Sequence, residues 1–369
     1  MPKTIRWGIL GAGNIARGIA QGLRLLPEAQ LLGVASRNPA NAKKFAADFS
    51  VPRVYQTYEE LVKDAEIDVI YVATPHSRHK EDCILCLENG KAVLCEKPFT
   101  INAREAREIV DLARQKGLFC MEAMWMRFIP LVQKVKAMVD SGAIGEVRML
   151  SADFGVPTHF DPHNRFFDPG QGGGALLDRG VYAVSLAYLL LGAPGEIVSE
   201  ATIGTTGVDE QAAILLRYPK GQLATLTASL RTYSSNEAVI MGSKGKIRLH
   251  EPFYCPQKAS SSAFVEPGPP TPAGSPGLKD KVRTQLKENP VLRPVYKGLK
   301  EYVLPVVRHP DTIVDHFEGN GYNYELAEVV RCLQTGQLES KVMPLDETVK
   351  IMEIMDQVRQ QWGLKYPQE

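Results

Sequence analysis

Residues 5–121 alternate short runs of β-branched and other apolar residues with longer amphipathic stretches. This alternation is typical of a parallel sheet whose strands are buried between layers of helices. We therefore expect a doubly wound α/β domain over residues 1–123. The pattern predicts strands at Ile5–Leu10, Leu31–Ser36, Val69–Ala73, Ala92–Cys95 and Phe119–Met121, and helices near Ile15–Leu26, Pro39–Phe49, Tyr58–Lys63, Arg78–Asn89 and Ala103–Lys116.

From Gly145 onward the pattern changes to strand-like runs that follow one another with hairpin-length connections, such as Pro219–Gly221 and Ser243–Gly245. Such connections favour antiparallel pairing. Residues 124–369 are therefore expected to form an α+β domain with an open, mainly antiparallel sheet. The pattern predicts strands at Val147–Phe154, Ala212–Tyr218, Leu223–Leu230 and Glu237–Met241, and helices near Leu131–Ser141, Ala175–Leu191, Tyr324–Gln334 and Leu345–Trp362.

One segment of the second domain, about residues 258–315, is set apart by its composition. Glu266–Gly277 reads EPGPPTPAGSPG, which is too rich in Pro and Gly for regular structure, and Lys279–His309 is basic. We interpret the segment as a solvated surface insertion. A role in docking a partner or a membrane surface is the alternative.

The overall charge and the cysteines indicate what kind of ligand and which cellular compartment to expect. Lys plus Arg number 43 and Asp plus Glu 42, so no global field would draw the chain to nucleic acid, and a small ligand is the better expectation.

We expect no secretion signal. The apolar run Val181–Leu191 is shorter than the ~20 residues of a membrane span and predicts a buried helix. The 6 scattered cysteines suit reduced thiols, and hence a cytoplasmic location.

The strand Ile5–Leu10 runs into Gly11, Ala12, Gly13, Asn14, Ile15 and Ala16, a G-x-G-x-x-A loop that opens a helix. In such a loop Gly11 permits the tight turn, and Gly13 lets the backbone approach a pyrophosphate. Ala16 allows close packing of the helix, whose amino end attracts phosphates. Because the loop lies between a predicted strand and a predicted helix, it predicts dinucleotide binding.

The end of the second strand indicates which dinucleotide is used. NAD-specific domains place an acid there for the ribose hydroxyls, whereas this chain has Ser36 and Arg37. An arginine and a hydroxyl suit a 2′-phosphate, which an acid would repel. NADP is therefore expected, and NAD, with Arg37 facing solvent, is the alternative.

Two further motifs supply candidate chemistry. Glu96 and Lys97 end a strand at the carboxyl edge of the sheet, where open α/β sheets bind ligands. Asp178 and Tyr182 are four residues apart and share one helix face. Hydride transfer needs a group that exchanges the hydroxyl proton. Tyr182 could serve if an ammonium such as Lys97 lowered its pKa, and Asp178 could orient that lysine or bind a substrate hydroxyl.

A metal site is an alternative for one cluster. His76, His79, Cys83 and Cys86 form H-x2-H-x3-C-x2-C, and the last three share a helical face. The two cysteines are interleaved with Ile84, Leu85 and Leu87, so packing against the sheet explains them better. We expect no metal.

The motifs GAGNIA, EKP and GGGALLDRGVY, in this order and spacing, resemble those of the Gfo/Idh/MocA family of oxidoreductases. Within it, MEAMWMRFIP (121–130) and GLKYPQ (363–368) are most similar to dimeric dihydrodiol dehydrogenases, also described as NADP-dependent D-xylose dehydrogenases. The resemblance implies a Rossmann domain and an α+β domain that dimerises through its open sheet face. The chain departs from it at Tyr254, where relatives usually carry Trp, and in residues 258–315, most of which they lack.

The resemblance also implies residue roles. Lys97 and Tyr182 would be catalytic, with Asp178 assisting, and His79 and Arg165 would approach the nicotinamide half of the cofactor. Trp125 and Phe154 would line the substrate pocket beside Asp178 and Tyr182. The expected cofactor contacts are Gly11, Gly13, Asn14, Ile15, Ser36, Arg37, Thr74, His79, Glu96, Lys97 and Arg165.

The expected activity is reversible, NADP-linked hydride transfer to or from a cyclic vicinal diol or pyranose, such as a trans-dihydrodiol or a D-xylose-like sugar. Two alternatives remain. One is a glucose-fructose-type oxidoreductase that never releases its cofactor. The other is a redox sensor that binds NADP without turnover and docks a partner through the basic insertion.

Overall fold

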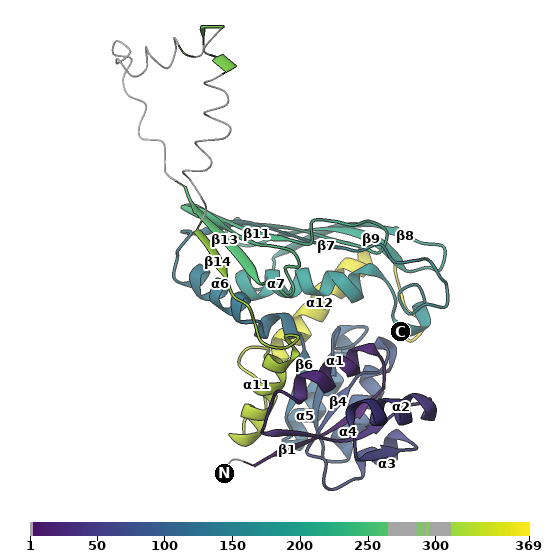
Figure 1. Cartoon of the computed structure of the whole chain (residues 1–369). Coiled ribbons are helices and arrows are strands. Elements are labelled where there is room, and N and C mark those ends of the chain that lie inside the picture. The colour runs from purple at the N-terminus through teal and green to yellow at the C-terminus, as the bar shows by residue number, and fades with distance from the viewer. Residues whose placement is uncertain (1–2, 265–285, 287, 291–292, 295–310) are drawn as a thin grey trace.

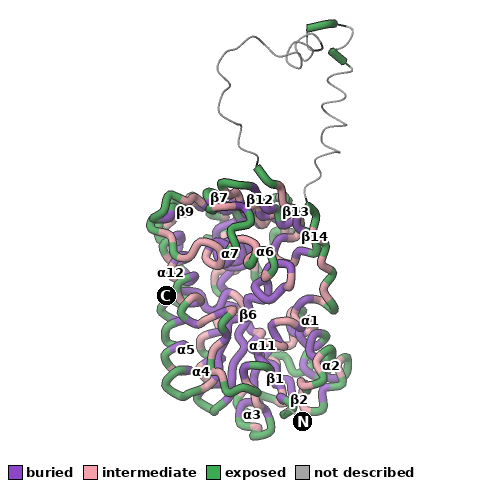
Figure 2. The backbone as a smooth tube through the Cα atoms, turned by 90° about the vertical axis from the view of Figure 1, so that its left-hand side faces the viewer, coloured by how far each residue is buried: buried purple, intermediate pink, exposed green. Residues whose placement is uncertain are grey.

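The structure is a computed structural model that describes residues 3–264, 286, 288–290, 293–294 and 311–369. Two sheets stand one above the other, and the chain's last helices run between them (Figure 1). Buried residues run through both sheets and through the region between them near β6 (Figure 2). The two halves therefore share one continuous hydrophobic core.

The first half is the predicted doubly wound domain. All strand pairs in its sheet are parallel, in the order β3-β2-β1-β4-β5-β6. The three-residue edge strand β3 was not predicted, because its residues are only half-buried. The elements are β1 (Ile5–Leu10), α1 (Asn14–Leu23), β2 (Ala29–Ala35), α2 (Pro39–Phe49), β3 (Arg53–Tyr55), α3 (Tyr58–Val62), β4 (Val69–Val72), α4 (His79–Glu88), β5 (Ala92–Glu96), α5 (Ala103–Lys116) and β6 (Cys120–Ala123).

The second half carries the predicted open sheet, in the order β14-β13-β12-β11-β7-β10-β9-β8. Its pairs are antiparallel except that of β7 with β10. The strand prediction missed β8, β12, β13 and β14. The elements are α6 (Pro130–Asp140), β7 (Val147–Gly155), α7 (Val181–Leu191), β8 (Glu196–Ile203), β9 (Asp209–Arg217), β10 (Leu223–Ser229), β11 (Ala238–Gly242), β12 (Gly245–Leu249), β13 (Lys258–Ala263), β14 (Asp311–Val314), α11 (Tyr322–Gln334) and α12 (Leu345–Gln361).

Helices cover only one face of this second sheet (Figure 1). On that side lie α6 and α7, and the strands alternate between residues buried on the helix side and residues exposed on the other side, as along β9. Met149 and Val198 are large apolar residues that remain exposed. Within the described residues, the predicted open sheet therefore keeps one face bare of helices.

The last two helices return to the first domain, since α11 packs on α1 and α12 packs on α5. The packing of α1 on α11 depends on small residues. A Cβ at Gly18 would lie 3.0 Å from the ring of Tyr322, and one at Gly22 would lie 3.0 Å from Leu326. The helix that follows the glycine loop is thus held by a segment more than three hundred residues further along the chain.

The insertion begins and ends at neighbouring points of the second sheet. β13 and β14 pair antiparallel, with Lys258 opposite Val314, so residues 258 and 314 lie side by side. The predicted irregular segment Glu266–Gly277 lies outside the described residues, as does almost all of the basic segment Lys279–His309.

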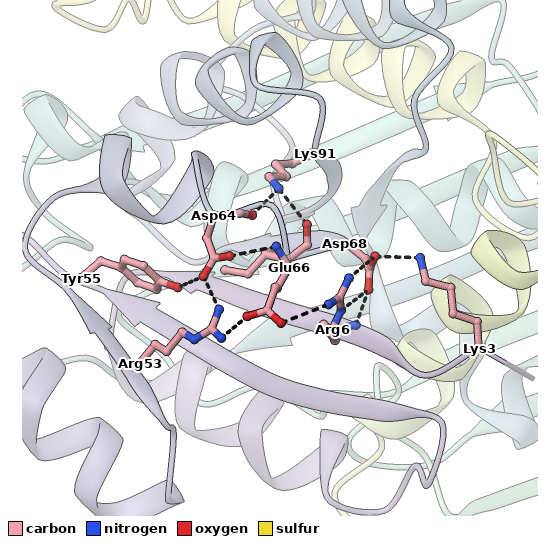
Figure 3. Close-up of polar contacts among 9 residues, drawn as sticks. Lys3, Arg6, Arg53, Tyr55, Asp64, Glu66, Asp68 and Lys91 are labelled. Carbon is pink, nitrogen blue, oxygen red and sulfur yellow. Dashed lines mark hydrogen bonds and ion pairs between the residues drawn. The ribbon is translucent and has the colours of Figure 1, made fainter.

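Charged residues form a network of ion pairs and hydrogen bonds at the edge of the first sheet where its strands begin (Figure 3). Asp68, just before β4, accepts hydrogen bonds from the backbone N of Arg6 at 2.9 Å and from Lys3 Nζ at 2.8 Å. Arg53 of β3 binds Asp64 at 2.6 Å. Although burial opposes its charge, the contacts from Tyr55 and Arg53 lower the pKa of Asp64 to about 2. The opposite, carboxyl edge of the same sheet borders a cavity.

One described stretch, Pro169–Leu191, is long and apolar enough to pass as a membrane span by length and composition. However, 78% of its most apolar window is buried inside the protein. It contains the predicted buried helix Val181–Leu191, and it behaves as the core helix of the second domain.

Candidate active site

A cavity of about 610 Å³ lies between the carboxyl edge of the first sheet and the second domain. Every residue that the sequence assigns to cofactor, substrate or catalysis lines it except Trp125. From the first domain these are Gly11, Gly13, Asn14, Ile15, Ser36, Arg37, Thr74, His79, Glu96 and Lys97, and from the second Phe154, Arg165, Asp178 and Tyr182. Segments up to 171 residues apart thus converge on one site.

The glycine loop has the shape that a pyrophosphate needs. Gly11 has a φ of 96°, and a Cβ there would lie only 2.5 Å from the carbonyl oxygen of Ala73. At Gly13 no atom lies within 4 Å of the Cβ position, so the backbone is open to a ligand. The first turn of α1 contains no acid that would repel phosphate. The loop therefore fits a dinucleotide.

Ser36 and Arg37 follow β2 at one end of the cavity. Asn38 begins α2, because its side chain accepts hydrogen bonds from the backbone N of Ala40 at 3.0 Å and of Asn41 at 3.4 Å. Arg37 is exposed beside this turn. Among the described residues that line the cavity the carboxylates are Glu96 and Asp178, and neither lies near the end of β2 in the sequence.

Lys97 and Asp178 form the charged centre of the site. Lys97 Nζ donates to the backbone oxygen of Asp178 at 2.8 Å and lies 3.6 Å from its Oδ1. Arg165 Nη1 donates to the same Oδ1 at 3.1 Å. Burial opposes a charge on Asp178, but the attraction of Lys97 and then of Arg165 holds its pKa well below the ordinary value. Asp178 is therefore a carboxylate that fixes two cations.

Tyr182 lies beside this pair, and the expectation for its pKa is wrong. Lys97 Nζ lies 4.7 Å from the centre of the Tyr182 ring rather than at its hydroxyl. Burial raises the pKa of Tyr182 well above its ordinary value. The hydroxyl accepts a hydrogen bond of 2.9 Å from Trp125 Nε1. In this arrangement Tyr182 is a neutral phenol, because desolvation outweighs the hydrogen bond from Trp125, which favours the phenolate.

Asp178 and Tyr182 do face the same cavity, but the local helix is wider than predicted. Residues Leu176–Gly180 form a π-helical turn, which continues into α7 at Val181. Single π turns inside helices often occur at functional sites. The side chain of Arg179, in the same turn, donates to the carbonyl oxygens of Val156 and Ser229.

The residues of the metal alternative make other contacts in the structure. The Nδ1 of His79 lies 2.9 Å from the carbonyl oxygen of Pro98, and its Nε2 lies 2.9 Å from that of Thr74. His76 Nδ1 lies 2.9 Å from the carbonyl oxygen of Gly172. Cys83 is buried, and its burial raises the pKa of the thiol well above the ordinary value. His79 thus joins the segments after β4 and β5, beside the cofactor end of the cavity.

Several lining residues were not assigned to the site from the sequence, namely Tyr58, His76, Phe166 and Gln171. They lie in loops or at helix starts, and the only sequence motif among them is the one that marked His76 as a possible metal ligand. Next to the cavity, Tyr254 stacks on Phe154 at 4.4 Å, and Tyr322 packs on Trp125 at 4.5 Å. Trp125 therefore lies behind Tyr182 in an aromatic cluster rather than on the cavity wall.

The comparisons with known proteins decide the family. Residues 5–124 match the family model described as "Oxidoreductase family, NAD-binding Rossmann fold", and residues 132–248 match the GFO/IDH/MocA C-terminal domain. Trans-1,2-dihydrobenzene-1,2-diol dehydrogenases from Bos taurus and Homo sapiens are 36% identical to the chain, and each match covers 99% of both sequences. The chain belongs to the Gfo/Idh/MocA family. It is an oxidoreductase.

Solved structures have the same two-domain fold. KijD10, a 3-ketoreductase from Actinomadura kijaniata in complex with NADP and TDP-benzene, is 25% identical with a TM-score of 0.78, covering 97% of this chain and 98% of that one. A levoglucosan dehydrogenase in complex with NADH and levoglucosan is 17% identical with a TM-score of 0.80, covering 99% and 100%. The neighbours thus include complexes of both nicotinamide cofactors.

Proposed function

We propose that this oxidoreductase transfers hydride between NADP and a cyclic vicinal diol or pyranose sugar. The observation that carries the proposal is the single cavity that joins the glycine loop and Arg37 to the Lys97–Asp178–Tyr182 group. When bound, the nicotinamide would supply or accept the hydride. The chain's own residues have to hold the cofactor, orient the substrate and move one proton.

For the cofactor, Arg37 supports NADP over NAD. An exposed guanidinium after β2, in the lining of the cavity that holds the glycine loop, suits a 2′-phosphate. The complex of KijD10 with NADP agrees with this choice, whereas levoglucosan dehydrogenase was solved with NADH.

For the proton, Tyr182 is the proposed acid and base. As a buried phenol it donates its proton to a substrate carbonyl during reduction, and the Lys97 ammonium over its ring stabilises the phenolate that remains. The indole N–H of Trp125 also points at the phenol oxygen and favours the same anion. In the oxidation direction the phenolate takes the hydroxyl proton.

Asp178 has two proposed tasks. Its carboxylate anchors Lys97 and Arg165, and it can accept a hydrogen bond from a second substrate hydroxyl next to the reacting one. A vicinal diol presents such a pair of hydroxyls, and aromatic rings such as Phe154 pack well against the apolar face of a ring. The dihydrodiol dehydrogenases that the chain resembles are named for a cyclic diol, and KijD10 for ketone reduction.

We also propose that the protein is a cytoplasmic homodimer. The bare face of the second sheet exposes Met149 and Val198, and exposed apolar residues on a sheet face suit an interface between two copies. All 6 cysteines are free thiols, which fits a reducing compartment.

Steady-state assays test the activity. Purified protein is given NADP or NAD with trans-dihydrodiols, D-xylose and related pyranoses, and reduced cofactor is followed by absorbance. We expect turnover with NADP. Tyr182→Phe should lose about a hundredfold or more in kcat and retain NADPH binding.

A variant as active as the parent would remove Tyr182 from the mechanism. Reduced nucleotide that copurifies and never exchanges would indicate the glucose-fructose-type reaction instead. Cofactor binding with no turnover on any substrate would indicate a sensor.

A further inference from the structure

The turn Gly172–Gly174 lies directly before the helix that carries Asp178 and Tyr182. Residues from three other segments of the chain contact it. Gly172 and Gly174 have φ values of 74° and 118°, which only glycine adopts without strain. Each of the three glycines meets a different distant residue. The conformation of the turn is therefore set by tertiary contacts.

The most consequential contact comes from Asp209, at the start of β9. Its Oδ2 accepts a hydrogen bond of 2.7 Å from the backbone N of Leu176, the first residue of the π-helical turn. Its Oδ1 occupies the space where a side chain at position 174 would start, 2.2 Å from the Cβ position of Gly174. Asp209 thus acts as a helix cap supplied by a residue 33 positions away.

The carboxyl group of Asp209 lies in an environment that disfavours its charged form. The residue is fully buried, and burial raises its pKa to about 7 even though the hydrogen bond from Leu176 opposes the shift. Arg359 of α12 and Tyr366 are the charged and titratable groups that face it from the neighbouring segments. A buried carboxyl with one oxygen that has no hydrogen-bond partner among the described residues is unfavourable for stability alone, so its contact with the helix start points to another role.

The second contact comes from Tyr366, near the end of the chain. Its hydroxyl donates a hydrogen bond of 2.6 Å to the carbonyl oxygen of Gly173. The Arg359 guanidinium lies 4.9 Å from the centre of the Tyr366 ring, and Arg359 binds Glu369 at 2.8 Å. The C-terminal segment is therefore anchored on α12 while it holds the glycine turn.

The third contact comes from the first domain. The His76 ring nitrogen lies 2.9 Å from the carbonyl oxygen of Gly172, and a Cβ at Gly172 would lie 2.9 Å from the Cβ of His76. His76 also lines the cofactor end of the cavity. The glycine turn is thus the place where the two domains meet beside the helix of Tyr182.

We propose that Asp209 and Tyr366 are positioning residues for the reaction. They fix the glycine turn and the start of the helix, and thereby place Asp178 and Tyr182 against substrate and cofactor. The expected effect on the reaction rate rests on the proposed hydride transfer. The expected effect on the conformation of the turn and helix rests on the fold alone. A shift of about 1 Å in a reacting group can cost roughly a hundredfold in rate, so loss of the cap should act mainly on kcat.

Hydrogen exchange tests the structural part without any substrate. In Asp209→Ala the amides of residues 174–182 should exchange about tenfold faster or more than in the parent, because the cap on Leu176 N is lost. Amides of β1 and β5 should be unchanged. NADPH affinity, read by fluorescence, should stay within about threefold of the parent.

Kinetics test the catalytic part with matched variants. Asp209→Ala should lower kcat by about tenfold or more with a smaller change in KM, whereas Asp209→Asn, whose amide oxygen can still accept from Leu176 N, should recover most of it. Tyr366→Phe should lower kcat by about threefold to tenfold. Its control is Tyr218→Phe, a buried hydroxyl with no partner among the described residues, which should leave kcat unchanged. Ile247→Ala in β12 controls for lost stability alone.

Two results would overturn the proposal: unchanged exchange at residues 174–182 in Asp209→Ala, or a kcat of Asp209→Ala equal to that of Ile247→Ala. If the parent turns over no diol or sugar, the proposed function fails. The exchange experiment would still decide whether Asp209 holds the helix.

Discussion

The indole N–H of Trp125 donates a hydrogen bond of 2.9 Å to the hydroxyl of Tyr182. Trp125 follows the last strand of the first sheet, and Tyr182 belongs to the core helix of the second domain. The contact therefore joins the segment that follows the first sheet to the core helix of the second domain, at the proposed proton-transfer atom. Tyr182 lines the cavity, whereas Trp125 does not.

Replacing Trp125 by Phe removes that donor and keeps a ring in the cluster. The N–H stabilises the phenolate more than the phenol, so its loss should raise the pKa of Tyr182 further. We expect diol oxidation at neutral pH to slow by about tenfold. In a pH–rate profile, the rise of oxidation with pH should move to higher pH. A profile identical to that of the parent would exclude the contact from proton transfer.

Cofactor choice is expected to depend on Arg37. In Arg37→Ala the KM for NADP should rise about tenfold to a hundredfold, since a charge-assisted contact to the 2′-phosphate is lost, while the KM for NAD should change little. Arg148→Ala, an exposed arginine on β7, is the control. Equal effects on both cofactors would show that Arg37 does not read the phosphate.

Lys97 is expected to affect both the phenolate of Tyr182 and the charge on Asp178. Lys97→Met removes the ammonium over the Tyr182 ring and one of the cations that hold Asp178 charged, so the pKa of Asp178 should rise toward its ordinary value. Turnover should fall by about a thousandfold. Arg165→Met keeps Lys97 and should cost much less, because the cation at the ring remains. Similar losses in the two variants would contradict the special place of Lys97.

Glu122 of β6 is fully buried, and neither of its oxygens has a hydrogen-bond partner among the described residues. Burial raises its pKa to about 7. Between the unfolded value of ~4.3 and about 7, the folded protein holds more proton than the unfolded chain, so this group lowers the free energy of unfolding as pH rises.

Glu122→Gln should remove that dependence. Its stability relative to the parent is expected to increase from pH 5 to pH 8 by about 1 to 3 kcal/mol, measured by urea unfolding at each pH. Glu59→Gln, at an exposed position, should show no such trend. A constant difference between Glu122→Gln and the parent across pH would refute the assignment.

The strands of the first domain could be predicted because burial on both faces makes them continuously apolar, as Val69–Val72 shows. β8 could not, because it lies at a sheet edge and its residues are largely exposed. β13 could not either, because its serine-rich sequence lacks the β-branched residues that mark strands. These strands form through their partners rather than through their own composition.

By itself, the sequence determined the dinucleotide loop, since Gly11 and Gly13 act through backbone space that their local spacing already fixes. It also named Lys97, Asp178 and Tyr182 through motifs. Only the tertiary structure decided how these three meet. Burial keeps Tyr182 a neutral phenol, Lys97 lies over its ring, and Asp209 and Tyr366 clamp the turn before the helix. Desolvation and contacts between distant segments have no local sequence signal, because both depend on how the whole chain packs.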